Sequence, residues 1–542
     1  MRKMAGIAIL ILSVVLGICL SGILSHSKTY EECIIDSEEY DRIISERSED
    51  KGLLKSLIFD GESLFLDQSS NIFYYSIIEG NSGAFNPQVE AFTEQGTINI
   101  AFLESELSTE VVKNNQAIGV LAYTQENYCE YRLICTTLPM MNISCMDKIV
   151  REFVPMEMTV FDNRQGAVNR VIVSSGEICI RGATTSVFPK KGYRIALTME
   201  SLGGNVRSNQ ISLLGMRQDD DWILYAAYND QEKIRNVFSS NLWKYTCAED
   251  NEDKVDAGME YKYLELFVNG EYWGLYALGF PIDAKQLRMS SNTAEQALYK
   301  KIAWDSENNM QITEGDVVSG YEVKNANNET GVQPKDWILL WEYYDTLFRN
   351  QDNIETLYNG IDIDNAIDFY LFINMIQGVD HAGGNTIKNS YLAITREREG
   401  LKALYIPWDM DITWGNGYIG ETASNYTIPY GISAEENYFI KSGYLYWLIQ
   451  NHDAIIEERI LEKYWSLRAD KWSERYLNEL LDEYETDIYD SGAFLRDRER
   501  WPEGTYSDPE IGLDDFREYV RDRLQEMDVY YQGLELSAFT SS

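Results

Sequence analysis

Two carboxylates follow an apolar run in the segment LYIPWDMDITWGNG, residues 404–417. Asp409 and Asp411 are two residues apart, and side chains at that spacing share one face of a strand. Mg²⁺ and Mn²⁺ prefer hard oxygen ligands, and waters and substrate phosphates complete their coordination shell. The pair therefore predicts a metal site at the end of a strand. The alternative is that both carboxylates only cap the turn that follows.

A polar loop precedes this segment, in INMIQGVDHAGGNTIKNSYLAI. The pattern predicts a helix that ends before Asp380, a loop with Asn385 and Asn389, and then a strand. Asp380 and Asn385 have the D-x-x-x-x-N spacing of a protein-kinase catalytic loop, in which Asp orients the substrate hydroxyl and Asn binds a metal ion. Both residue types are common in loops, so the spacing alone is weak. The order of helix, loop, strand pair and strand-terminal Asp409 supports the same chemistry.

The same carboxylates also fit a phosphatase hypothesis. Asp409, Asp411 and Thr413 form D-x-D-x-T, the nucleophile motif of haloacid-dehalogenase-like phosphatases, with Asp409 as nucleophile and Asp411 as acid and base. Such an enzyme places this strand early in a doubly wound sheet. Here the residues that follow have a helical pattern, so the phosphatase is the weaker alternative.

Basic side chains gather in RGATTSVFPKKGYRIAL, which contains Arg181, Lys190, Lys191 and Arg194, while ALYKKI contains Lys300. ATP phosphates need cations and backbone donors. These residues therefore predict a phosphate-binding segment in a chain that is otherwise short of positive charge. The alternative is a basic turn paired with surface carboxylates.

The elements that must position these residues change character along the chain. Residues 146–333 predict strands, with a hairpin at the Asn-Gly dipeptide of residues 269–270. Residues 334–542 predict helices and the catalytic loop, with Asp362 or Asp364 as an N-cap. The polar residues lie near the join. We therefore expect an α+β fold in which a β-rich lobe and a helical lobe, as in kinases, enclose a cleft.

The upstream residues predict export and a separate module. Residues 1–25 contain Arg2 and Lys3 before an apolar stretch, which is typical of a cleaved signal peptide or a membrane anchor. The rest of the chain is then extracytoplasmic, and only this segment meets the membrane. Residues 26–55 predict a charged spacer, and residues 56–145 predict a small β-sandwich.

The charge balance limits the partners. The 542 residues include 87 acidic and 47 basic ones, a net charge of −40. This charge opposes binding to nucleic acid and suits a basic protein partner, although it can also serve solubility alone. The cysteines are too sparse for a disulfide framework. One or two unassigned disulfides are possible among Cys129, Cys135, Cys145 and Cys179.

Taken together and in this order, several segments resemble the CotH family, the spore-coat-protein-H-like atypical protein kinases. They are RGATTSVFPKKGYRIAL, DWILYAAYNDQEKIRNVFSSNLW, YLELFVNGEYWGLYALGFPID, LYK, YEVKN, GNTIKNSYLAI and YIPWDMDITWG. The resemblance covers roughly residues 146–500. It implies a kinase-like fold that binds ATP with Mg²⁺ or Mn²⁺ and phosphorylates Ser or Thr of partner proteins, which in the family are basic and Ser-rich.

The resemblance also implies roles for particular residues. Asp380 resembles the catalytic aspartate, and Asp409 resembles the metal-binding aspartate of a motif that includes Trp408. Either Asn385 or Asn389 resembles the second metal ligand. Lys191 and Arg194 match the Lys and Arg of the family's Pro-Lys-Lys-x-Tyr-Arg segment. We expect these two residues, with Arg181, Lys300 and Trp408, to bind the cofactor.

Two departures from the family pattern keep a second function in view. Ala183 stands where the family usually has Asn, and Phe280 stands where it usually has Glu. If that Glu orders the nucleotide site, its loss weakens nucleotide binding. The alternative function is a kinase-like scaffold or adhesion protein of the cell envelope. Metal-dependent nucleotide binding separates the two.

Overall fold

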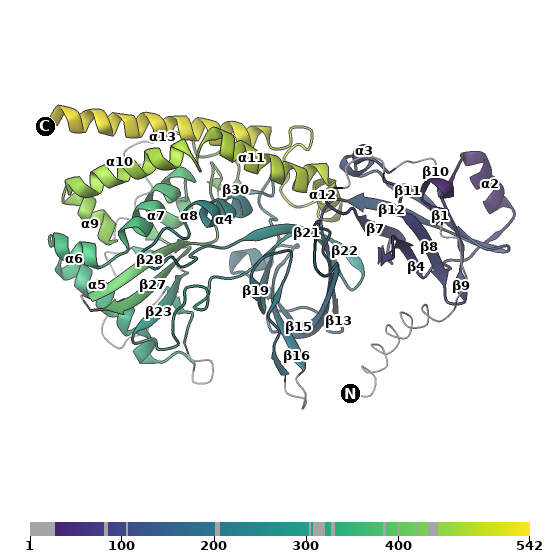
Figure 1. The fold of residues 1–542 in the computed structure, drawn as a ribbon, viewed down its shortest axis with the longest axis horizontal. Coiled ribbons are helices and arrows are strands. Elements are labelled where there is room, and N and C mark those ends of the chain that lie inside the picture. Colours follow the sequence, from purple (N-terminus) through teal and green to yellow (C-terminus); the bar gives the residue numbers. More distant parts are fainter. Residues whose placement is uncertain are drawn as a thin grey trace. The chain divides into compact units, whose positions relative to one another are not determined.

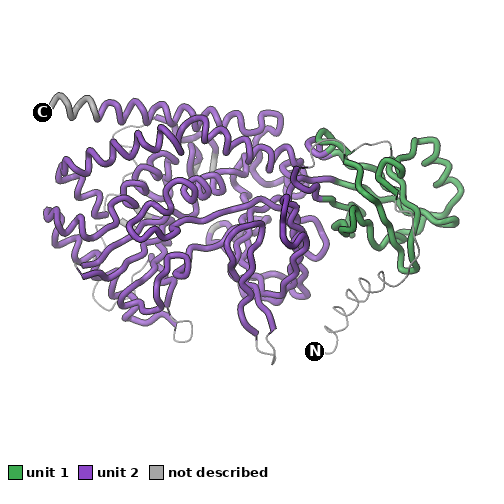
Figure 2. Tube along the Cα trace, viewed as in Figure 1, with its two compact units in different colours: residues 1–75, 81–111, 116–134 green, residues 76–80, 112–115, 135–542 purple. Residues whose placement is uncertain are grey.

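The computed structural model forms two compact units (Figure 2). The first unit comprises residues up to Tyr75 together with 81–111 and 116–134, and the second comprises 76–80, 112–115 and 135 onward. The residues that the structure describes are 28–80, 85–103, 107–200, 206–302, 305–306, 320–326, 331–382, 386–398, 400–419, 422–431 and 443–541. The predicted export segment and Asn385 lie outside the described residues.

The first unit is built from two sheets of short strands. Its apolar centre includes Tyr30, Phe59 and Phe102, and the rings of Tyr30 and Phe102 stack with centroids 4.2 Å apart. The first sheet contains β1 (Lys28–Thr29), β8 (Gln88–Thr93), β4 (Ser56–Phe59), β5 (Glu62–Ser63) and β9 (Gly96–Thr97). The second contains β2 (Ile34–Ile35), β10 (Asn99–Leu103), β11 (Ile118–Tyr123), β12 (Asn127–Thr136), β7 (Ile72–Ser76), β6 (Phe65–Asp67) and β3 (Ser48–Glu49).

The boundaries of this unit differ from those expected. Residues 28–55 do not form a spacer, because they supply β1, β2, β3 and helix α2 (Ser37–Ser45), and Ile43 and Leu54 are buried. At the other end, β13 (Met140–Cys145) pairs with strands of the second unit. In α2, Tyr40, Ile43 and Ile44 pack together at a helical spacing, but the charged residues around them led to the prediction of a spacer.

The second unit contains a closed barrel of seven described strands. The order is β15 (Val171–Arg181), β14 (Val154–Phe161), β13, β21 (Tyr261–Val268), β22 (Glu271–Gly279), β20 (Asp221–Tyr225) and β16 (Gly192–Glu200), and β16 pairs back with β15. Alternate side chains fill its interior, among them Met158, Ile178, Ile195 and Leu264. The predicted hairpin joins β21 and β22, with positive φ at Asn269 and Gly270.

A second, antiparallel sheet lies beside the helices of this unit (Figure 1). Its order is β25 (Tyr321–Val323), β23 (Gln296–Lys301), β27 (Ser390–Glu397) and β28 (Gly400–Pro407). Strand β23 comes from the predicted β-rich half and β27 from the predicted helical half. One sheet therefore crosses the boundary predicted at residues 333 and 334, because pairing between distant strands leaves no local mark in the sequence.

Helices cover this sheet and complete a mixed α+β fold. Asp362 is the N-cap of α7 (Ile363–Met375), as one of the two predicted alternatives, and its side chain accepts a hydrogen bond from Asn365 N. The other longer helices are α4 (Arg235–Thr246), α5 (Ile338–Arg349), α10 (Ala454–Ala469), α11 (Glu474–Glu485), α12 (Ala493–Arg500) and α13 (Asp514–Ser541). Short ones are α3 (Thr109–Lys113), α6 (Ile354–Asn359), α8 (Val379–Ala382) and α9 (Tyr444–Gln450).

The remaining described elements are short. The short strands are β17 (Val206–Ser208), β18 (Ile211–Ser212), β19 (Gln218–Asp219), β24 (Asp305–Ser306), β26 (Thr386–Ile387), β29 (Gly417–Ile419) and β30 (Thr422–Ser424). The helical turns are η1 (Glu31–Cys33), η2 (Thr184–Val187), η4 (Pro334–Trp337) and η5 (Thr486–Asp490). The described cysteines form no disulfide with one another. Across the described ranges, no helix is long and apolar enough to cross a membrane.

Candidate active site

The predicted catalytic residue Asp380 lies on α8, directly after α7, and only 3% of it is exposed. Its Oδ2 accepts hydrogen bonds from Lys388 Nζ at 3.1 Å and from Asn389 Nδ2 at 2.9 Å. Its Oδ1 is buried and has no hydrogen-bond partner among the described residues. Burying an unpaired carboxylate oxygen costs free energy, so this arrangement is suited to accept a proton from a bound hydroxyl.

The metal-site segment begins where β28 ends. Trp408 N donates to Asn389 O at 3.0 Å, and Asn389 Nδ2 lies 3.5 Å from Asp409 O, which ties the two polar loops together. Asp409 has φ of 60°, a left-handed conformation that ends the strand. Asp409 and Asp411 therefore lie in the turn after β28. The spacing had predicted that they share one face of a strand, and this prediction is wrong because the strand ends before both residues.

The two carboxylates have different environments. Asp409 is exposed, and its carboxylate makes no hydrogen bond or ion pair with the described residues. Asp411 is 8% exposed, and its Oδ2 accepts a hydrogen bond from Asn229 Nδ2 at 3.4 Å. Burial raises the pKa of Asp411 well above its ordinary value, and the charges of Asp409 and Asp380 raise it further. Three carboxylates close enough to repel one another favour a bound cation.

These donors fit Mg²⁺ or Mn²⁺ better than a metal that requires a complete protein shell. The described residues contain no group of three His, Cys, Asp or Glu side chains placed to hold a metal by themselves. Magnesium keeps several waters and is typically held by one or two carboxylates and substrate phosphates. Asp409 and Asp411 supply that number of carboxylates. Asn389 uses its Nδ2 to hold Asp380, and its Oδ1 is the atom through which it could bind the metal as well.

Three predicted cofactor-binding residues from distant segments meet at one aromatic ring. Arg181, at the end of β15, places its guanidinium carbon 5.1 Å from the centre of the Trp408 ring, and Lys300 Nζ lies 4.4 Å from it. The ring of Tyr391 meets Trp408 edge to face at 5.7 Å. Burial, followed by the charge of Arg181, lowers the pKa of Lys300 to about 8. Two cations held over one ring beside Asp409 are of the charge and placement that could bind phosphate oxygens.

The other predicted cations bind the protein itself. Lys191 Nζ donates to Ser186 O at 2.9 Å. Arg194 is exposed on β16 and forms a two-pronged ion pair with Asp221, one contact of which is 2.8 Å. Lys190, in the same basic segment, is fully buried. The alternation of side chains along β16 directs Arg194 away from the barrel interior, and the sequence did not reveal which face would meet the site.

Several site residues were not predicted. Asn236, on α4, accepts a hydrogen bond from Met410 N at 2.8 Å and so holds the turn that carries both carboxylates. His381 Nε2 lies 2.9 Å from Trp408 O, and burial lowers the pKa of His381 to about 4. In the sequence, Lys388 could have been placed at the site only because it precedes Asn389. Asn236 gave no local sign beyond its place at a helix start.

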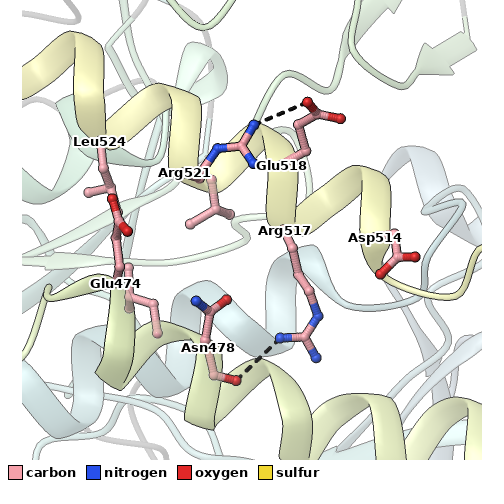
Figure 3. A pocket seen from close by; sticks show the side chains of 9 residues that line it. Glu474, Asn478, Asp514, Arg517, Glu518, Arg521 and Leu524 are labelled. Carbon is pink, nitrogen blue, oxygen red and sulfur yellow. Dashed lines mark hydrogen bonds and ion pairs between the residues drawn. The ribbon is translucent and has the colours of Figure 1, made fainter.

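A pocket of about 360 Å³ elsewhere in the second unit contains none of these residues (Figure 3). It is lined by residues of α11 and α13, among them Arg517 and Arg521. Both are already paired, Arg517 with Asp482 and Glu485 and Arg521 with Glu518 and Asp522. The two arginines of the pocket are therefore already neutralised by carboxylates of the protein.

The chain belongs to the CotH kinase protein family, whose model matches residues 178–527. None of the curated proteins matches the chain. The matched region begins within β15 and includes every site residue described above. The resemblance seen in the sequence is confirmed, and the first unit lies outside the matched region.

Proposed function

We propose that this protein is a secreted or membrane-anchored atypical protein kinase that transfers the γ-phosphate of ATP to a Ser or Thr hydroxyl. One observation carries the proposal: buried Asp380, with one unpaired oxygen, lies beside an acidic turn whose Trp408 supports Arg181 and Lys300. A proton acceptor, metal-binding carboxylates and phosphate-binding cations are the parts that phosphoryl transfer requires. Family membership supports the same activity.

Each residue has a defined task in this mechanism. Asp380 accepts the proton of the substrate hydroxyl at Oδ1, while Lys388 and Asn389 fix the carboxylate through Oδ2. Asp409, with Asp411, would hold Mg²⁺ or Mn²⁺, which supplies charge neutralisation for the phosphates when bound. Arg181 and Lys300 orient the phosphate oxygens from the Trp408 ring. The two-lobed arrangement of kinases is part of this proposal.

Two features of the sequence support the proposed placement and the proposed partner. The apolar stretch after Arg2 and Lys3 supports an extracytoplasmic protein, either secreted or anchored through its N-terminal segment. A net charge of −40 supports a basic, Ser-rich protein substrate through electrostatic steering, and it disfavours nucleic acid.

The second candidate function is a kinase-like scaffold of the cell envelope, and Phe280 favours it. Phe280 is 1% exposed in the barrel core, with the guanidinium of Arg217 4.2 Å from its ring centre. The position where the family usually has Glu is therefore apolar and structural here.

The phosphatase alternative lacks the fold that its motif requires. Strand β28 lies at the edge of an antiparallel sheet, whereas that enzyme class uses a doubly wound parallel sheet.

Calorimetric titration with ATP and Mg²⁺ separates kinase from scaffold. The wild-type protein should bind ATP only with the metal, and Asp409→Asn should weaken this binding at least ~100-fold, as loss of a metal-ligating charge implies. Asp352→Asn is the matched control, because Asp352 is also exposed but lies before α6. Wild-type protein that binds no nucleotide at any metal concentration would favour the scaffold.

A further inference from the structure

A buried ion pair lies apart from the residues assigned above. Lys190 Nζ lies 2.7 Å from Asp497 Oδ1, and neither side chain is exposed. Asp497, on α12, also accepts hydrogen bonds from Leu275 N at 2.9 Å and from the Tyr506 hydroxyl at 2.9 Å. Burial lowers the pKa of Lys190, and the charge of Asp497 opposes that shift. A buried pair seldom adds stability over an apolar pair of the same size, so its value lies in the geometry that it fixes.

Tyr506 connects this pair to a second buried lysine. Lys233 Nζ lies 3.9 Å from the centre of the Tyr506 ring and donates to Thr505 O at 2.7 Å and to Ala227 O at 3.0 Å. The backbone of Lys233 has a positive φ of 64°, which is uncommon for any residue other than glycine. We call Lys190, Lys233, Asp497 and Tyr506 the Asp497 cluster. It joins α12 and the residues after it to the loop of residues 226–233.

Backbone contacts reinforce the same junction. Thr505 N donates to Tyr228 O at 3.1 Å, and Ser507 N donates to Gln231 O at 3.0 Å. The ring of Tyr228 stacks on Phe188, with centroids 5.1 Å apart. Phe188 belongs to the loop of residues 182–191, which ends with Lys190 and Lys191.

Both loops reach the candidate active site. The loop 182–191 begins directly after Arg181, whose guanidinium lies over Trp408. The loop 226–233 contains Asn229, which donates to Asp411 Oδ2. The Asp497 cluster therefore anchors one loop that leads to a phosphate-binding cation and another that contacts a metal-site carboxylate.

We infer that Asp497 is a positioning residue for the nucleotide. From α12 it fixes the loop 182–191 through Lys190 and the loop 226–233 through Tyr506 and Lys233. In this way it sets where Arg181 stands relative to Asp411. The inference rests on the proposed function for its effect on ATP, while its geometric part concerns the protein alone.

The test combines hydrogen exchange of the metal-free protein with titration of ATP and Mg²⁺, for wild type and Asp497→Asn. The substitution keeps the shape of the side chain but removes the charge that holds Lys190. We expect faster amide exchange in residues 182–191 and 226–233, and ATP affinity reduced about 10- to 100-fold, the size of effect expected when binding groups are misplaced.

Glu265→Gln is the matched control. Glu265, on β21, is fully buried and pairs with Arg496, also on α12, with one contact of 3.0 Å. It therefore reproduces the loss of a buried carboxylate between α12 and the barrel without touching either loop. We expect a lower melting temperature, unchanged exchange in the two loops and unchanged ATP affinity.

A double variant, Lys190→Met with Asp497→Leu, separates positioning from stability. An apolar pair should recover much of the melting temperature, but the hydrogen bonds to Leu275 and Tyr506 are lost, so ATP affinity should stay low. Recovery of affinity together with melting temperature would overturn the inference, as would wild-type exchange rates in both loops of Asp497→Asn. Wild-type protein that binds no ATP would refute the proposed function and the effect on ATP, and exchange would still decide whether Asp497 fixes the loops.

Discussion

Lys300 should make nucleotide binding depend on pH. Its ammonium lies 4.4 Å from the centre of the Trp408 ring, and burial, followed by the charge of Arg181, lowers its pKa to about 8 from an ordinary 10.5. Bound phosphate would keep the lysine protonated, because an opposite charge stabilises the cation. Free protein loses this proton as the pH rises through about 8, so ATP affinity should fall above that pH.

The size of the effect follows from this shift. Well above pH 8, each pH unit costs about tenfold in affinity until the pKa of the bound state is reached. Between about pH 7 and pH 9.5 the affinity should fall about 30-fold, equivalent to about 2 kcal/mol. The assay is titration with ATP and Mg²⁺ across this range, with adenosine as a ligand that lacks the phosphates and should show no such slope.

Lys300→Arg provides the decisive comparison. A guanidinium stays charged throughout this range, so the variant should bind ATP and lose the slope. Lys300→Met should bind weakly at every pH. If wild type shows no slope, or if Lys300→Arg keeps it, Lys300 does not hold the phosphates.

Three further changes test separate parts of the account. Burial raises the pKa of Asp368 to about 7, although Lys463 Nζ lies 3.0 Å away and opposes this shift. The folded protein therefore keeps a proton on Asp368 up to about pH 7, whereas the unfolded chain releases it above about pH 4. Wild type should lose up to about 4 kcal/mol between about pH 4 and pH 8 relative to Asp368→Asn, measured by chemical denaturation; equal pH profiles would contradict this. Asn236→Ala leaves the buried Met410 N–H unpaired and should cost about 1–3 kcal/mol in thermal melts and weaken metal-dependent ATP binding; full ATP affinity would show that the turn is held otherwise. Trp408→Leu removes the ring beneath two cations and should weaken ATP binding about tenfold or more by titration, since each cation–π contact contributes about 0.5–2 kcal/mol.

Local motifs revealed much of the candidate site. Asp380, Asn389, Trp408 and Asp409 lie in two short segments whose order along the chain was sufficient to predict that they meet. The hairpin at residues 269–270 was also predictable, because an Asn-Gly pair between alternating apolar runs specifies its turn type. In both cases the information lies within a few consecutive residues.

The parts that were not predicted depend on distant pairing. Lys191 and Arg194 share a basic segment with Lys190, but only the closure of β15 on β16 determines which of them faces the protein interior. Asp497 lies far along the chain from Lys190, and no local pattern connects the two. The barrel was not predicted for the same reason, because β13 pairs with β21 across most of the β-rich half of the sequence.

The central claim is that Asp380 accepts the proton of a substrate hydroxyl, and phosphate incorporation tests it most directly. Purified protein comprising residues 26–542 would be incubated with labelled ATP, Mg²⁺ or Mn²⁺ and basic Ser-rich peptides, in parallel with Asp380→Asn. Wild type should transfer phosphate to Ser or Thr only with the metal. Asp380→Asn should lose about 10²–10⁴-fold in turnover and keep ATP affinity within a few-fold, because loss of a positioned base affects the chemical step. Transfer that is equally fast in both proteins, or absent from wild type, would contradict the account.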